Sequence, residues 1–173
     1  LMHRIILAVF ILTCITSGAV IAKCDPVCPK EVRLPVINKD YGIVVIGDDA
    51  FVEQVNHALF ELEYDGWLAY VDTQTIAIRQ ADLGIYAAGT YRKIAGGYEV
   101  LIDNTTHVLS DFDIARDIVH EAAHIQQSKV GHPECGPWAE WAADQVEGAF
   151  VISAGMGAWI RIRDPQNIPS CKE

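Results

Sequence analysis

The stretch from residue 110 to residue 131 constrains the chain most, because it carries a complete set of helix signals. Ser110 followed by Asp113 is typical of a capping-box start, and Gly131 followed by Pro133 is typical of a helix end. Apolar residues recur between these signals at helical spacing, at Phe112, Ile114, Ile118, Val119, Ala122 and Ile125. We therefore predict a half-buried helix across this stretch.

Two histidines lie four residues apart in this predicted helix, in the pattern HExxH. Residues four apart lie on the same helix face, so His120 and His124 can bind one metal ion through their imidazoles. Glu121 lies about 100° around the helix from His120, close enough to hold a water molecule on that metal. The alternative is a surface helix with two unrelated histidines. Uncharged residues at Ala122 and Ala123 favour the metal site.

Two histidines leave a zinc ion one protein ligand short. Glu140 lies early in the next predicted helix, and Asp144 follows it by one turn on the same face. A short loop makes the two helices antiparallel neighbours, which brings Glu140 back toward the imidazoles. His132 is an alternative third ligand, and a solvent-facing Glu140 without a role is the remaining alternative.

The segment His120-Glu121-x-x-His124, followed by Glu140-Trp-Ala-Ala-Asp144, resembles the gluzincin metallopeptidases, the thermolysin-like clan, in a minimal single-domain form. The resemblance implies one Zn²⁺ ion bound by His120, His124 and Glu140. It implies that Glu121 is the general base toward a zinc-activated water and later passes the proton to the leaving amine. It also implies that Asp144 orients His120.

The same resemblance implies a group that stabilises the oxyanion and a strand that binds the substrate. No second subdomain carries the usual histidine or tyrosine, so the candidates are Tyr86, Tyr91, Tyr98 and His132. Residues 98–103 are expected to be the edge strand along which an extended peptide lies.

Short helix and strand patterns fill the rest of the expected domain, residues 41–173. Asp48 or Asp49 is expected to cap a helix over residues 51–64, and Pro137 to open another that ends near Gly155. The predicted strands are residues 41–46, 68–71, 75–79, 91–95 and 98–103, the last two joined as a hairpin around Gly96-Gly97. This order predicts an α+β, zincin-like fold: a helix, a small mixed sheet, the HExxH helix and then the glutamate helix.

The first 22 residues have the pattern of a secretory signal peptide, with a short basic start, an apolar run and small residues before a cleavage point near Ala22. A transmembrane anchor is the alternative, but the apolar run is too short to span a bilayer. Residues 23–40 follow as a proline-containing extended arm. We therefore expect export to the periplasm or the extracellular space, with no stable membrane span after signal removal.

Four cysteines remain after removal of the signal, and an even number in an oxidising compartment indicates disulfides. They are Cys24, Cys28, Cys135 and Cys171. Three pairings are possible; we favour Cys135 with Cys171 and Cys24 with Cys28. A second zinc site built from these thiols is the alternative.

The formal net charge of −10, with no stripe of basic residues, argues against nucleic acid as a partner. The expected partner is a peptide or protein substrate, and the oligomeric state is left open. The sequence thus predicts an exported zinc metallopeptidase, an endopeptidase by expectation. The alternative is a secreted, zinc-stabilised binding or inhibitory domain without efficient turnover. Glu121 favours the enzyme, because a structural zinc site has no use for a carboxylate beside an open coordination position.

Overall fold

The computed structural model describes residues 36–37, 41–72, 75–84, 87–132, 136–157, 160 and 162–167, all within the unit Arg33–Glu173. The expected signal peptide, Tyr86 and the four cysteines Cys24, Cys28, Cys135 and Cys171 lie outside the described residues. The domain boundaries and disulfide pairings stay predictions. Among the described residues, no helix has the length and hydropathy that crossing a membrane requires.

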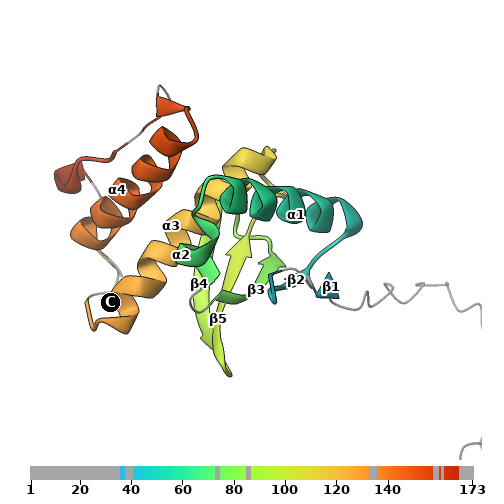
Figure 1. Ribbon diagram of the computed structural model, residues 1–173. Helices are drawn as coiled ribbons and strands as arrows, with labels where there is room; N and C mark the ends of the chain where they lie inside the picture. Colours follow the sequence, from blue (N-terminus) through green and yellow to red (C-terminus); the bar gives the residue numbers. More distant parts are fainter. Residues whose placement is uncertain are drawn as a thin grey trace, which may run out of the picture. The chain divides into compact units, whose positions relative to one another are not determined.

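A mixed sheet of five strands forms one layer of the described fold (Figure 1). Its strands follow the order β1-β2-β3-β5-β4, and β2, β3 and β5 run parallel. The outer strands β1 and β4 each pair antiparallel with their neighbour. The strands are β1 (Val36–Ile37), β2 (Val44–Ile46), β3 (Thr75–Gln80), β4 (Gly89–Ile94) and β5 (Gly97–Ile102).

The three predicted helices occur in the predicted order around this sheet, with one short helix that was not predicted after the first of them. They are α1 (Asp49–Tyr64), α2 (Leu68–Asp72), α3 (Asp111–Lys129) and α4 (Pro137–Ser153), with a 3₁₀ turn η3 (Pro165–Asn167) after them. Helices α1 and α3 pack on each other, α3 packs on β4 and β5, and α4 packs on α3 (Figure 1). The predicted α+β architecture, with a mixed sheet between the first helix and the HExxH helix, is confirmed.

The core lies between the sheet and the helices α1 and α3. Fully buried residues from every layer meet there, among them Val45, Phe51, Leu59, Leu62, Ile78, Val100, Ile102, Ile114 and Ile118. Each of these side chains contributes about 1.5–3 kcal/mol through burial. The apolar stripe predicted for α3 is therefore the surface that fixes this helix against the sheet.

Hydrogen-bonded caps set where the two long core helices begin. Asp48 accepts a hydrogen bond from the Phe51 N–H at 2.8 Å and so caps α1. At α3 the Ser110 hydroxyl accepts from the Asp113 N–H, and the Asp113 carboxylate accepts from the Ser110 N–H, as a full capping box. Such caps stabilise a helix by about 0.5–2 kcal/mol. Both predicted helix starts are confirmed.

One of the predicted strands is wrong: residues 68–71 belong to helix α2. The chain leaves α1 through Gly66 at φ 78°, and the Trp67 carbonyl then accepts hydrogen bonds from the N–H groups of Tyr70 and Val71. The Trp67 and Tyr70 rings pack edge to face at 5.8 Å. Local helical bonding and ring packing therefore override the strand preference of these residues.

The predicted edge strand is also wrong. Residues 98–103 fall on β5, which pairs with β3 on one side and β4 on the other, so the edge strand beside α3 is β4. The hairpin itself is confirmed, with Gly96 at φ 91° in its turn. The hairpin folds its first strand to the outside because its second strand continues the parallel part of the sheet.

Asp103 organises the chain between β5 and α3. Its carboxylate is buried and accepts hydrogen bonds from the N–H groups of Leu83, Thr105 and Thr106 and from the Thr105 hydroxyl. Burial opposes its ionisation, but these four donors hold the pKa of Asp103 well below its usual range. The charged carboxylate thus fixes the loop that leads into the HExxH helix.

Candidate metal centre

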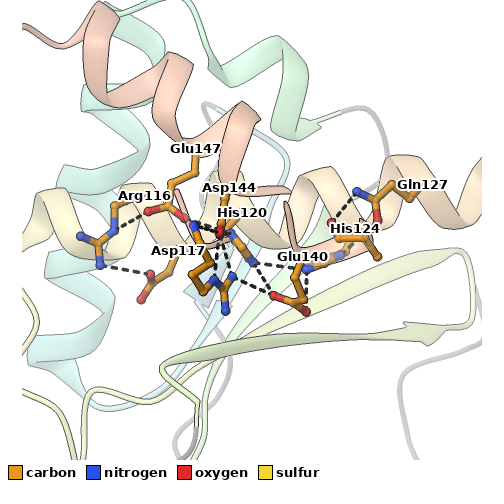
Figure 2. A network of polar contacts seen from close by, with 10 residues as sticks. Arg116, Asp117, His120, His124, Gln127, Glu140, Asp144 and Glu147 are labelled. Atoms are coloured by element: carbon orange, nitrogen blue, oxygen red, sulfur yellow. Dashed lines mark hydrogen bonds and ion pairs between the residues drawn. The ribbon is translucent and has the colours of Figure 1, made fainter. Parts of the chain in front are cut away.

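The structure brings the two histidines of α3 and Glu140 of α4 to one point (Figure 2). The Nε2 atoms of His120 and His124 lie 3.2 Å apart. The Glu140 carboxylate places Oε2 at 3.5 Å from the His120 Nε2 and Oε1 at 3.4 Å from the His124 Nε2. Zinc binds nitrogen and oxygen ligands at about 2.0–2.2 Å, so the edges of a tetrahedral zinc site measure about 3.3–3.5 Å. The three donor groups have the spacing of such edges.

Helix packing explains why Glu140 reaches the imidazoles. Pro137 stands in the first turn of α4, as predicted, and the short connection after α3 turns the chain back along it. Small buried residues lie on both helices near the site, Ala123 on α3 and Ala139 and Ala143 on α4. Small side chains let two helices approach closely. The backbone of α4 thus comes near enough for a glutamate to reach across.

The electrostatics of the site favour a positive ion. Hydrogen bonds from His120 and His124 hold the pKa of Glu140 well below its usual range. Burial alone lowers the pKa of His120, but the carboxylates of Glu140 and Glu147 outweigh burial and raise it well above its usual range. A divalent cation bound by neutral imidazoles would supply the positive charge that these carboxylates stabilise. The donor set therefore fits a metal ion such as zinc.

A second group of possible donor atoms lies on the other side of the His120 ring, formed with Asp144 and Glu147. The donors of this group already have partners. The Asp144 carboxylate accepts hydrogen bonds from the Arg163 backbone N–H and guanidinium, at 2.6–3.0 Å. The His120 Nδ1 lies 2.9 Å from the Glu147 Oε2. The second group thus lies at the Nδ1 side of the His120 ring, whereas His124 and Glu140 lie at its Nε2 side.

The ring of His124 is also held from outside the metal position. Its Nδ1 lies 3.3 Å from the Gln127 Oε1, and the Gln127 amide donates to the Ala139 carbonyl at 3.1 Å. Tyr91 of β4 stacks on the other side, with ring centroids 6.2 Å apart and planes 16° apart. Gln127 therefore joins α3 to α4, and Tyr91 joins α3 to the edge strand, both at the same imidazole.

Glu121, the predicted general base, is buried against the start of the edge strand. Its side chain is only 7% exposed, and burial raises the pKa of Glu121 to about 7, although the nearby His120 and His124 lower it. A methyl group added at Gly89 would lie 3.2 Å from the Glu121 Oε1. Gly89 thus leaves the space that this carboxylate occupies.

If Glu121 is the general base that the resemblance implies, the substitution Gly89→Ala is expected to lower turnover about tenfold while metal binding is unchanged, because a displacement of this carboxylate by a few tenths of an ångström misplaces the proton acceptor. The residue lies in extended backbone without a positive φ, so alanine itself is tolerated there. The measurement is kcat and zinc stoichiometry side by side. Thr90→Ser, at the next position of β4, is the matched control. Equal kcat in Gly89→Ala and the wild type would contradict this role.

Two weaker predictions are not brought to the metal position. His132 is exposed just beyond α3 and belongs to neither donor group found among the described residues. The Tyr98 hydroxyl lies 3.4 Å from the Ser128 Oγ, one helical turn beyond His124, and the side chain is buried. Tyr91, another oxyanion candidate, stacks on the ring of His124.

An apolar cavity of about 340 Å³ lies between the end of α3 and the start of α4. Its walls are almost wholly apolar, and it is lined by Gln127, His132, Gly136, Pro137, Trp138, Ala139 and Ala142. Gln127, which contacts His124, and Ala139, the neighbour of Glu140, connect this cavity with the metal centre. Trp138 is therefore a wall of this cavity, although its side chain is largely exposed.

Sequence reasoning missed several residues of this site, among them Glu147, Arg163 and Gly89. Glu147 had a detectable signal, because it lies seven residues after Glu140 and so on the same helix face. Arg163 and Gly89 had no such signal in the sequence. Arg163 reaches α4 from outside the described helices and strands, and strand pairing places Gly89 beside α3. The site thus depends on long-range contacts beyond its motif.

No protein-family model, curated protein or solved structure matches the chain in comparisons with known proteins.

Proposed function

We propose that the protein is a zinc-dependent metallopeptidase of the gluzincin type, with His120, His124 and Glu140 as the metal ligands. The observation that carries the proposal is the short distance between the two imidazole Nε2 atoms and from each of them to one oxygen of the Glu140 carboxylate, 3.2–3.5 Å. Two imidazoles and one carboxylate are a common ligand set of catalytic zinc, and three protein ligands leave one coordination position open. The HExxH pattern and the glutamate on a second packed helix support the same assignment.

His120, His124 and Glu140 would hold the zinc ion, which would act as a Lewis acid that lowers the pKa of a water molecule and polarises a peptide carbonyl. Glu121 accepts a proton from that water as the water oxygen forms a bond to the carbonyl carbon. The C–N bond then breaks, and Glu121 returns the proton to the leaving amine nitrogen. Burial raises the pKa of the Glu121 carboxylate, which suits a group that first accepts and then returns a proton.

The substrate is proposed to lie along β4 as an extended peptide. This strand has an open edge, since it pairs only with β5 among the described strands. Gly89 and Tyr91 lie two residues apart on β4 and therefore share one face of the strand. Gly89 lies against Glu121 and Tyr91 stacks on His124, so this part of the strand runs over the catalytic residues. Backbone hydrogen bonds to an edge strand bind a peptide without demanding a particular sequence.

The site of action is proposed to be outside the cytoplasm, because residues 1–22 have the pattern of a signal peptide. An acidic chain without a basic stripe is consistent with a protein substrate and gives no support for nucleic acid. Substrate side chains of apolar character fit the cavity beside Gln127.

Metal removal tests the proposal. The purified protein, loaded with one equivalent of zinc, is expected to cleave denatured casein, to lose this activity on dialysis against a chelator, and to regain it when zinc is added. Mg²⁺ in excess is the control and is not expected to restore cleavage, because it prefers an octahedral set of oxygen ligands. A protein that binds zinc and a peptide but cleaves no substrate would instead support the binding-domain alternative.

A further inference from the structure

The carboxylate that contacts His120 from behind the metal position belongs to Glu147. Its Oε2 lies 2.9 Å from the His120 Nδ1, within hydrogen-bond distance. Asp144, the residue to which the resemblance gives this task, comes no closer than 3.7 Å to the same nitrogen. Both carboxylates project from α4 toward α3 (Figure 2). Only Glu147 has the distance of a direct bond to the imidazole.

Asp144 is committed to another partner. Its Oδ2 accepts from the Arg163 backbone N–H at 3.0 Å and from Nε at 2.9 Å, while its Oδ1 accepts from Nη2 at 2.6 Å. The same guanidinium also donates to the Glu140 Oε2 at 2.8 Å. Asp144 is nearly fully buried, so its charge depends on Arg163 for compensation. The Asp144 and Arg163 pair thus holds the third metal ligand and not the first.

Glu147 is held from α3 as well. Its Oε1 forms an ion pair with the Arg116 Nε at 3.2 Å, and Arg116 lies one helical turn before His120. The Arg116 guanidinium also lies 3.5 Å from Asp113 and 3.7 Å from Asp117. Each oxygen of the Glu147 carboxylate therefore has its own positively charged or hydrogen-bonding partner, both on the helix that carries the histidines.

We propose that Glu147, supported by Arg116, is the positioning residue of His120, and that Asp144 with Arg163 positions Glu140. This inference rests on the metal site proposed above. By accepting the Nδ1–H, Glu147 fixes the tautomer in which Nε2 keeps its lone pair for the metal, and it holds the plane of the ring. Glu147 thus orients His120, the role that the resemblance gives to Asp144, and Asp144 orients Glu140 instead.

The division makes a quantitative prediction for zinc affinity. Carboxylates that orient a metal-bound histidine typically account for about 10–100-fold of metal affinity. We expect Glu147→Gln to weaken zinc binding by about this factor, measured by competition with a chromophoric chelator. Glu147→Asp, which keeps the charge, is expected to recover part of the loss. Asp144→Asn is expected to weaken zinc binding less than Glu147→Gln does.

Glu53→Gln is the matched control, because it makes the same chemical change at an exposed position of α1. Its zinc affinity is expected to equal that of the wild type. ¹⁵N NMR of His120 in the zinc-loaded protein distinguishes the positioning role of Glu147 from a merely structural one. The Nδ1–H proton of the wild type is expected far downfield, as in a bond to a carboxylate, and is expected to move upfield in Glu147→Gln.

Three results would overturn the inference, and each has a different consequence for the metal site. Unchanged zinc affinity and an unchanged Nδ1–H resonance in Glu147→Gln would remove the role of Glu147. Complete loss of the ion from Glu147→Ala, with wild-type zinc content in Glu140→Gln, would make Glu147 a metal ligand. A wild-type protein that binds no zinc would end both this inference and the proposed function. The first result leaves the proposed function standing, and the second replaces Glu140 as the third metal ligand.

Discussion

Replacing Glu121 with glutamine is expected to lower kcat for peptide hydrolysis by about 10²–10⁴-fold while the protein still binds one zinc ion. Glutamine has nearly the same shape as glutamate, so it fits the buried space beside Gly89 without disturbing the core. Its amide has no basic oxygen and accepts no proton from the attacking water. The three metal ligands are untouched, so the loss is confined to the proton transfer.

The measurement combines kcat on a fluorogenic peptide with zinc content by atomic absorption. Glu53→Gln on the exposed face of α1 provides the matched control and is expected to behave as the wild type. Full activity in Glu121→Gln would show that another group accepts the proton. Loss of zinc together with activity would show instead that Glu121 supports the metal centre.

The second large effect concerns the third ligand. Glu140→Ala is expected to weaken zinc binding by more than the 10–100-fold that typically follows loss of an orienting residue, because it removes a donor to the ion itself. His132→Ala is expected to keep one zinc ion per chain, since His132 is exposed and lies outside the donor group. Equilibrium dialysis against a zinc buffer measures both affinities.

Glu140→Ala also leaves the Arg163 guanidinium without one of its two acceptors. Glu140→Gln separates the two effects, because its amide oxygen still accepts from Arg163 but is a weak ligand for zinc. Equal zinc affinity of Glu140→Gln and the wild type would argue that the carboxylate serves only Arg163. Loss of zinc from His132→Ala alone would move the third ligand to the loop between α3 and α4.

The parts of the site that the sequence predicts are those set by local geometry. A helix of period 3.6 puts His120 and His124 on one face, and no other part of the chain is needed to decide this. Glu140 follows from a short connection, which leaves few ways for α4 to return along α3. These predictions succeed because the contacts span one turn or one helical hairpin.

Strand order and the choice among neighbouring carboxylates are set by the whole fold. Nothing local decides whether β4 or β5 faces outward, because that depends on which strand pairs with β3. Likewise Asp144 and Glu147 share a face of α4. The rotation of the packed helix and the position of Arg163 decide which of them contacts His120. The misassigned strand at residues 68–71 has the same cause, since ring packing around Trp67 favours a helical turn.

The metal donors come from two separate helices, so a bound ion also holds these two helices together. An ion bound by α3 and α4 together acts as a crosslink between them. An ion present at 100 times its dissociation constant stabilises the folded protein by about 2.7 kcal/mol. Because α4 packs mainly on α3 and on η3 in the described fold, it is the element that gains most from this crosslink. Depletion of the ion is therefore expected to expose α4 first to limited proteolysis.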